Sequence, residues 1–178
     1  MRWYCLRDLK RPNCKVKAYQ ELAELGFRVF TPLREAVKVV KGKKIILHRP
    51  VISDLLFVQS QRDLLDPIIE RTPTLQYRYV RGGAYQEAMT VPDRQMEDFI
   101  KAATMGDSPV YLQPESIDRT IVGRPVRVVG GQLDGIEGKV LAIRGKKKRR
   151  VLLELPGMLS VTIEVTPDLL EIIRKQGS

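Results

Sequence analysis

The stretch Arg49-Pro-Val-Ile-Ser-Asp-Leu-Leu-Phe-Val-Gln-Ser60 organises the first half of the chain. Residues 55–58 within it form a continuous apolar run with polar residues on both sides. A strand with one exposed face alternates polar and apolar side chains, so this run predicts a strand that is buried on both faces. The two-residue period places Leu55 and Phe57 on one face and Leu56 and Val58 on the other. We expect one face to pack on the domain's own helices and the other to meet more of this protein or a partner.

Composition and charge narrow the possible partners. The chain has 178 residues, enough for one or two small domains, and its apolar fraction of 43% supports packed cores. Its net charge of +10 points to a polyanion or an acidic partner surface, although a merely soluble basic protein fits as well. Residues 1–49 carry a net charge of +9, residues 50–120 carry −4 and residues 121–178 carry +5. This uneven distribution suggests separate surfaces for separate partners.

The sequence lacks the signatures of enzymes and of membrane proteins. No apolar run approaches the ~20 residues of a membrane-spanning helix, and the chain begins with strand-like sequence instead of a signal peptide. Cys5 and Cys14 fall outside the usual zinc spacings and are expected to be reduced thiols in the cytoplasm. His48 is the only histidine, and no catalytic triad, P-loop or metal-ligand set is present. We therefore expect a protein that is not an enzyme, uses no metal or cofactor and binds no membrane.

Helices, strands and a hairpin are expected in the first half. Strands are predicted over residues 2–6, 27–33 and 76–80, and helices over residues 12–25, over residues 64–71 with an interruption at Pro67, and from Pro92 onward. Pro12 suits the first turn of a helix, and Gly26 suits the left-handed position just past its end. The sequence Lys41-Gly-Lys-Lys44 separates two extended runs and predicts a β-hairpin with a basic tip. Such a tip either keeps an exposed edge soluble or contacts nucleic acid.

The second half has a different character. Glycine, serine and proline occur without periodicity after residue 105, which predicts a linker over residues 107–120 between domains at 1–106 and 121–178. Short strands are expected over residues 124–129, 138–144, 151–155, 160–165 and 169–173, with glycine- or proline-containing turns between several of them. This spacing predicts a small β-barrel. The expected fold class is an α+β N-terminal domain, an antiparallel sheet flanked by helices, followed by a small all-β barrel.

One segment of the second half resembles a known motif. It reads Val128-Val-Gly-Gly-Gln-Leu-Asp-Gly-Ile-Glu-Gly-Lys-Val140. Gly130, Gly131 and Gly135 permit a tight loop with positive backbone dihedrals, and Gly138 lets the returning strand approach closely. The segment resembles the KOW motif of transcription elongation factors and ribosomal proteins, which implies an SH3-like barrel.

The first half resembles the N-terminal domain of the NusG family. The resemblance rests on Trp3-Tyr4 in a first strand, a helix, a basic hairpin and the run from Arg49 to Val58. A NusG domain, a linker and a KOW domain together cover nearly the whole chain, which is identified as a member of the NusG family of transcription elongation and antitermination factors. The Ser53-Asp54 step and the basic hairpin resemble the specialised antiterminator branch, which includes RfaH and the factors for capsular polysaccharide operons.

The resemblance implies two binding surfaces in the first domain. Such factors bind the clamp helices of RNA polymerase through an apolar depression in the sheet, for which Tyr4, Leu55 and Phe57 are the candidates. The alternative is that these residues are simple core. Sequence-specific members also bind the exposed non-template DNA strand through basic residues near the first helix and after the central strand. The corresponding residues here are Lys10, Arg11, Lys15 and Arg71.

The resemblance also implies a partner for the KOW domain, either a small-subunit ribosomal protein or a termination factor. The apolar residues expected to form that surface are Leu133, Ile136, Met158 and Leu159. A polymerase-bound monomer that suppresses pausing or termination is the favoured function. The alternative is a ribosomal-type RNA-binding protein, in which the run Lys-Lys-Lys-Arg-Arg at residues 146–150 binds phosphates. That alternative leaves the acidic middle region and the Trp3-Tyr4 start unexplained.

Overall fold

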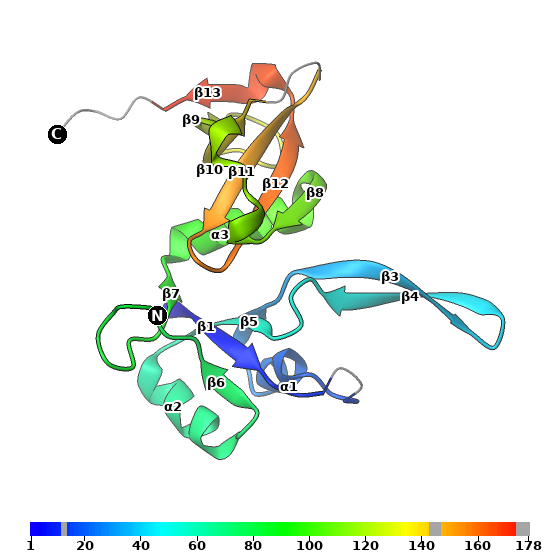
Figure 1. Cartoon of the computed structure of the whole chain (residues 1–178), viewed down its shortest axis with the longest axis vertical. Helices are drawn as coiled ribbons and strands as arrows, with labels where there is room; N and C mark the ends of the chain where they lie inside the picture. The colour runs from blue at the N-terminus through cyan, green and yellow to red at the C-terminus, as the bar shows by residue number, and fades with distance from the viewer. Residues whose placement is uncertain (12–13, 143–146, 174–178) are drawn as a thin grey trace. The chain divides into compact units, whose positions relative to one another are not determined.

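The computed structural model describes residues 1–11, 14–142 and 147–173, and the chain divides into two compact units, Met1–Asp93 and Arg94–Ser178 (Figure 1). The division falls at the start of helix α3 (Asp93–Met105) and not after it. The boundary predicted for the first domain, residue 106, lies after α3 instead. The predicted linker over residues 107–120 contains β8 (Asp107–Leu112), which is a strand of the second unit. Pro109 in that strand is tolerated because β8 lies at a sheet edge and the register shifts beside it.

An antiparallel sheet forms the centre of the first unit. Its strands follow the order β2-β5-β1-β6, with β7 also paired to β1. They are β1 (Arg2–Asp8), β2 (Arg28–Phe30), β5 (Leu55–Ser60), β6 (Leu75–Tyr77) and β7 (Thr90–Val91). The first four residues of β5 are buried, which confirms the strand predicted from the unbroken apolar run.

Two helices pack against one face of this sheet. They are α1 (Ala18–Glu24) and α2 (Arg62–Arg71). Leu22 of α1 and Leu65 of α2 join a buried cluster with Leu6, Leu56 and Val58 of the sheet. Because Leu56 and Val58 have the same parity in β5, this cluster accounts for one face of the strand.

Both helices differ from the sequence-based expectation. Helix α1 begins at Ala18, because the Asp8 carboxylate accepts hydrogen bonds from the backbone N–H groups of Lys10 (3.0 Å) and Ala18 (3.1 Å). The Asp8 side chain, ten positions earlier in the chain, therefore caps the first turn of the helix. Pro12, the predicted first residue of this helix, lies outside the described residues. Helix α2 continues through Pro67 without the expected interruption. Proline removes one backbone hydrogen bond, and the packed apolar face of α2 offsets that loss.

The predicted β-hairpin is present and is longer than expected. It consists of β3 (Leu33–Val40) and β4 (Lys43–Pro50), which form a separate two-stranded sheet. Lys41 and Gly42 make the turn with φ values of 48° and 76°. Two consecutive positive φ values define the type I′ turn, whose twist suits a two-residue hairpin. Figure 1 shows the hairpin extending as an arm from the sheet of the first unit.

The second unit consists of a six-stranded antiparallel sheet, which corresponds to the predicted barrel, and one α-helix. Its strands follow the order β13-β9-β10-β11-β12-β8. They are β8, β9 (Val122–Val128), β10 (Glu137–Leu141), β11 (Arg149–Leu155), β12 (Leu159–Val165) and β13 (Leu170–Ile172). Each of the five strands expected from the sequence overlaps one of these strands; residues 143–144 of the strand predicted over 138–144 lie outside the described residues. Three short 3₁₀ turns occupy Pro114–Ser116, Arg119–Ile121 and Pro167–Leu169.

Helix α3 is joined to the barrel by polar contacts within the second unit. The Arg94 guanidinium pairs with Glu137 at 2.8 Å, and the Gln95 amide donates to the backbone oxygen of Glu154 at 2.7 Å. At the other end of α3, the Lys101 ammonium donates to the backbone oxygen of Asp134 at 2.8 Å. These contacts explain why the helix groups with the barrel. Within the described ranges, none of the helices is long and apolar enough to cross a membrane.

Candidate functional site

The face of β5 that points away from α1 and α2 carries an apolar row. Cys5 of β1 lies directly opposite Phe57, and Phe30 of β2 lies opposite Phe57 on the other side. Directly opposite residues in an antiparallel ladder project to the same face. Leu55 has the same parity as Phe57 and Trp3 the same parity as Cys5, so both belong to this row. We call these five residues the docking face.

Tyr4 projects to the opposite face of the sheet from Leu55 and Phe57, so the structure does not bring together the three predicted polymerase-binding residues. Tyr4 lies opposite Val58, and its ring packs in the helix-covered core with a centroid 5.8 Å from that of Tyr77. Trp3 and Cys5 take the place expected for Tyr4. The two-residue period separates Tyr4 from Trp3 and Cys5, but the register that pairs Cys5 with Phe57 is visible only in the structure.

Four of the five residues of the docking face are buried in the free chain, and Phe30 is half-buried. Leu55 is 3% exposed, and Phe57, Trp3 and Cys5 are fully buried. Burial raises the pKa of the Cys5 thiol to about 12, although Arg78 nearby opposes the shift. The Arg28 guanidinium lies 5.1 Å from the centroid of the Trp3 ring, a cation–π contact. A partner can therefore bind the buried side chains of this face only when they are uncovered.

Asp54, the residue before β5, fixes one end of the docking face. Its carboxylate accepts from Arg7 Nε at 3.1 Å and pairs with Arg78 Nη2 at 3.0 Å. Its backbone oxygen accepts from the N–H of Asp8 at 3.0 Å. The Ser53-Asp54 step that the sequence singled out is therefore a junction that holds β1, β5 and the segment after β6 together.

The basic loop after β1 gathers most of the candidate nucleic-acid residues. Arg11 and Lys15 are exposed there. The N–H of Leu9 donates to the backbone oxygen of Thr74 at 2.8 Å, which ties this loop to the connection that follows Arg71 at the end of α2. Lys10 differs from the others, because its ammonium pairs with Glu21 and its side chain is only 17% exposed. Lys10 thus holds the loop, whereas the side chains of Arg11, Lys15 and Arg71 are exposed, with Arg71 Nε donating to the backbone oxygen of Pro67 at 3.0 Å.

The glycine-rich loop of the second unit has the expected geometry. Gly130, Gly131 and Gly135 have φ values of 85°, 71° and 83°, and the Asp134 carboxylate accepts from the N–H of Gly130 at 2.6 Å. A side chain at Gly138 would place its Cβ 2.7 Å from the backbone oxygen of Leu152. The close approach predicted for Gly138 is therefore present.

The predicted apolar partner surface on this loop is largely absent. Ile136 and Leu159 are fully buried and Met158 is 8% exposed, while Leu133 is half-buried. Leu159 is the first residue of β12 and lies opposite Leu155, and Ile136 immediately precedes β10. Both side chains consequently belong to the interior, and of the predicted residues only Leu133 retains substantial exposure.

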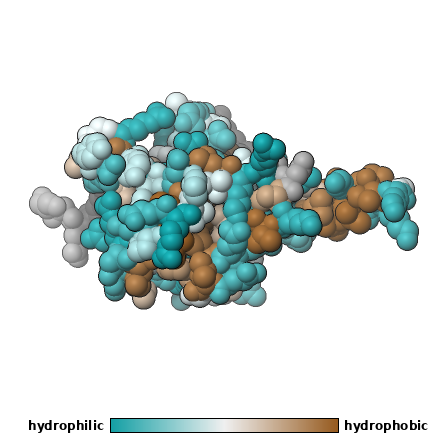
Figure 2. Space-filling view, turned by 90° about the horizontal axis from the view of Figure 1, so that it is seen from below, coloured by the Kyte–Doolittle hydropathy of each residue, from teal (hydrophilic) through white to brown (hydrophobic). Residues whose placement is uncertain are grey.

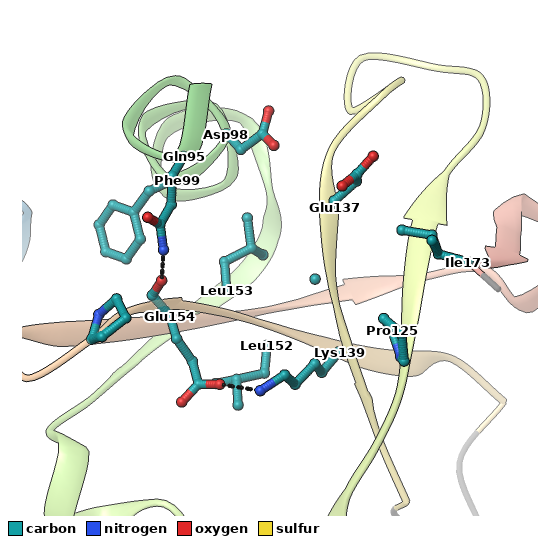
Figure 3. Close-up of a pocket in the computed structure, with 12 residues that line it drawn as sticks. Gln95, Asp98, Phe99, Pro125, Glu137, Lys139, Leu152, Leu153, Glu154 and Ile173 are labelled. Atoms are coloured by element: carbon teal, nitrogen blue, oxygen red, sulfur yellow. Dashed lines mark hydrogen bonds and ion pairs between the residues drawn. The ribbon is translucent and has the colours of Figure 1, made fainter. Parts of the chain in front are cut away.

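A cavity of about 310 Å³ lies between α3 and the barrel strands (Figure 3). Two carboxylates beside it are already paired: Glu137 with Arg94 and Arg127, and Glu154 with Arg119 and Lys139. Burial raises the pKa of the third, Asp98, although a backbone hydrogen bond from Glu137 opposes the shift. The paired acids hold elements of the second unit together. Among the described residues no group of three or more His, Cys, Asp or Glu side chains is placed to hold a metal ion.

Comparisons with known proteins show which family the chain resembles. A family model described as "Transcription termination factor nusG" matches residues 1–100, more than half of the chain. Among solved structures, the chain is similar to one titled "Domain interaction in Thermotoga maritima NusG", with 16% identity, a TM-score of 0.48 and 97% of each chain covered. No curated protein sequence matches the chain. The matched residues include the docking face, the hairpin and the basic loop.

Proposed function

Because the chain belongs to the NusG family of transcription factors, we propose that it is an elongation and antitermination factor that binds the clamp helices of RNA polymerase through its docking face. Factors of this family bind RNA polymerase and are not enzymes. The observation that supports this assignment is the apolar row of Leu55, Phe57 and Phe30 on the sheet face opposite α1 and α2. Bridging the polymerase cleft through such a face would favour the active over the paused state.

The docking face suits a helical protein partner. Aromatic side chains bury ~150–250 Å² each, and apolar area contributes about 25 cal/mol per Å², so Trp3, Phe30 and Phe57 supply most of the contact energy. Since most of the face is buried in the free chain, the measured affinity is the intrinsic affinity reduced by the fraction of molecules in which the face is uncovered. Polymerase binding is therefore coupled to that uncovering.

The basic loop gives the polymerase-bound factor a nucleic-acid contact. We assign Arg11, Lys15 and Arg71 to the backbone of the non-template DNA strand, with Lys10 as a positioning residue for the loop. Three phosphate contacts to a single strand predict that log K changes with log salt with a slope of roughly −2. Such contacts hold the strand without selecting its sequence.

Three finer assignments complete the proposal. The chain belongs to the specialised antiterminator branch that includes RfaH and the factors for capsular polysaccharide operons, which the junction at Asp54 and the basic hairpin support. It acts in the cytoplasm as a monomer. Its KOW domain recruits a small-subunit ribosomal protein or a termination factor through the loop that presents Leu133.

A ribosomal-type RNA-binding function has less support. In the run at residues 146–150, the Lys148 ammonium pairs with Asp107, and Arg150 pairs with Glu164 at 3.2 Å. Lys146 lies outside the described residues. Cations that already pair with carboxylates within the second unit bind added phosphate less strongly, because the existing pair must first be broken.

The test compares Leu55→Ala with Leu56→Ala in the full chain, using binding to bacterial core RNA polymerase. The two leucines are adjacent in β5, are 3% and 1% exposed, and project to opposite faces. Each substitution costs about 2–5 kcal/mol of folding free energy, so affinities are compared at a temperature at which both variants are folded. We expect Leu55→Ala to weaken binding at least about tenfold and Leu56→Ala to retain it. Equal affinities for the two variants would reject the docking face.

A further inference from the structure

The hairpin of β3 and β4 exposes an apolar row that the docking face does not use. Val37 lies opposite Ile46, and Val39 shares their face. These three side chains are 67%, 63% and 62% exposed. In Figure 2 the arm appears as a band of hydrophobic side chains bordered by hydrophilic ones. Large β-branched side chains with this exposure on a two-stranded ribbon indicate a surface that meets a partner.

Lysines lie on both faces of the hairpin that carries the apolar row. Lys44 lies opposite Val39 on the same face, and Lys38 and Lys43 occupy the other face. Residues 33–50 contain six Lys or Arg side chains and a single carboxylate, Glu35. That carboxylate lies 3.9 Å from His48. A hairpin with an apolar row and Lys44 on one face and further lysines on the other matches an apolar groove with acidic side chains around it.

The same features distinguish between classes of partner. A second copy of the hairpin would bring two strongly cationic surfaces together, which like-charge repulsion opposes. A wedge into a DNA duplex would carry its apolar side chains at the tip, where this hairpin has Lys41 and Gly42. A membrane-inserted arm would carry interfacial tryptophan or tyrosine, and the sequence of residues 33–50 contains neither. The observations therefore favour a protein.

We propose that the hairpin is a second docking arm, which binds an acidic protein surface with an apolar groove on RNA polymerase. This inference rests on the proposed function, since it places both contacts on the same enzyme. One face of an eight-residue, two-stranded ribbon covers roughly 250 Å², well below the ~800 Å² per partner of a stable interface. The arm consequently strengthens and orients binding through the docking face and does not replace it.

The experiment measures the affinity of full-length variants for bacterial core RNA polymerase without nucleic acid. The first variant, Val37→Thr/Val39→Thr/Ile46→Thr, removes apolar surface and keeps the strand-favouring β-branched shape. The second, Lys38→Gln/Lys43→Gln/Lys44→Gln, removes charge. We expect each to weaken binding about tenfold. The matched controls are Leu25→Gln, an apolar residue outside the hairpin that is 64% exposed, and Lys147→Gln; both should bind like the original chain.

The outcomes separate this inference from the proposed function. If both hairpin variants bind normally while Leu55→Ala does not, the docking arm is rejected and the docking face stands. If Leu55→Ala binds normally and the hairpin variants do not, the docking face is rejected and the arm stands. Weakened binding of the lysine variant to a duplex DNA oligonucleotide, with normal polymerase binding, would identify nucleic acid as the partner and overturn the inference. A sedimentation dimer that the threonine variant abolishes would overturn it in favour of a second copy.

Discussion

Cys5 and Phe57 lie directly opposite each other across the antiparallel ladder of β1 and β5. The thiol of Cys5 is therefore part of the docking face, while its neighbour Tyr4 points into the core on the other side. A single residue step between Tyr4 and Cys5 separates the helix-covered face of the sheet from the proposed docking face. The Cys5 thiol can also serve as a natural chemical probe of the proposed docking face.

The two cysteines should differ strongly in reactivity. Cys5 is fully buried and its pKa is raised to about 12, whereas Cys14 is partly exposed. Since the thiolate is the reactive species, an aromatic disulfide reagent at pH 8 should modify Cys14 quickly and Cys5 only after unfolding or uncovering of the docking face. In a Cys14→Ser variant, the slow rate at Cys5 then measures how often that face opens. Two thiols that react equally fast in the folded chain would contradict the burial of the face.

Tyr4 should contribute to stability and not to polymerase recognition. Its side chain is 8% exposed and packs on Tyr77. Tyr4→Ala should lower the free energy of unfolding of the first unit by about 3–5 kcal/mol, and Tyr4→Phe, which keeps the ring, should change it little. Urea unfolding followed by the fluorescence of Trp3, the only tryptophan, measures this directly. A Tyr4→Ala variant of normal stability with lost polymerase affinity would return Tyr4 to the docking face.

Local chemistry made much of the fold predictable. The buried strand β5, the turn at Lys41 and Gly42 and the positive φ of Gly130 each depend on residues within a short window, and each was expected from the sequence. The two-residue period placed Leu55 and Phe57 together on one face of the strand, and the resemblance to the NusG family made them the polymerase candidates.

Interactions between residues far apart in the chain account for the differences between the predictions and the structure. Helix α1 begins late because Asp8 caps it from ten positions away, and the expected linker contains a strand because β8 pairs with β12 far along the chain. Ile136 and Leu159 were expected on a binding surface, but their burial depends on packing that no local pattern specifies. Tyr4 was assigned by resemblance, and the register that instead places Trp3 and Cys5 on the face of Phe57 depends on the pairing of β1 with the distant strand β5.

The junction at Asp54 should matter more through Arg78 than through Arg7. The Arg7 side chain is 48% exposed and that of Arg78 is 27% exposed, so solvent screens the first ion pair more. Asp54→Asn should lower the free energy of unfolding of the first unit by about 1 kcal/mol, with a larger loss for Arg78→Gln than for Arg7→Gln. Trp3 fluorescence in urea again provides the measurement. Equal losses of unfolding free energy for the two arginine variants would show that the exposure of the arginine does not determine how much each ion pair contributes to stability.

Asp98 should limit the stability of the second unit at neutral pH. Burial raises the pKa of its carboxyl above the ordinary 3.8, so the folded state favours the protonated form. That preference stabilises the folded state below the ordinary pKa and is lost as pH rises through the raised pKa. Asp98→Asn keeps the shape and cannot ionise. It should match the original chain near pH 3 and exceed it at pH 7 by up to about 1 kcal/mol, discounted for partial exposure.

Thermal unfolding of the full chain at the two pH values, followed by far-ultraviolet circular dichroism, tests this sign. The matched control is Asp168→Asn, which changes an exposed aspartate of the same unit. This variant should not show the gain in stability between pH 3 and pH 7 that is expected for Asp98→Asn. The hydrogen bond from the backbone N–H of Glu137 to Asp98 opposes the raised pKa, and the asparagine oxygen can still accept it. If Asp98→Asn were less stable than the original chain at pH 7, the ionised carboxylate would instead be a net stabilising group beside Arg94 and Lys101.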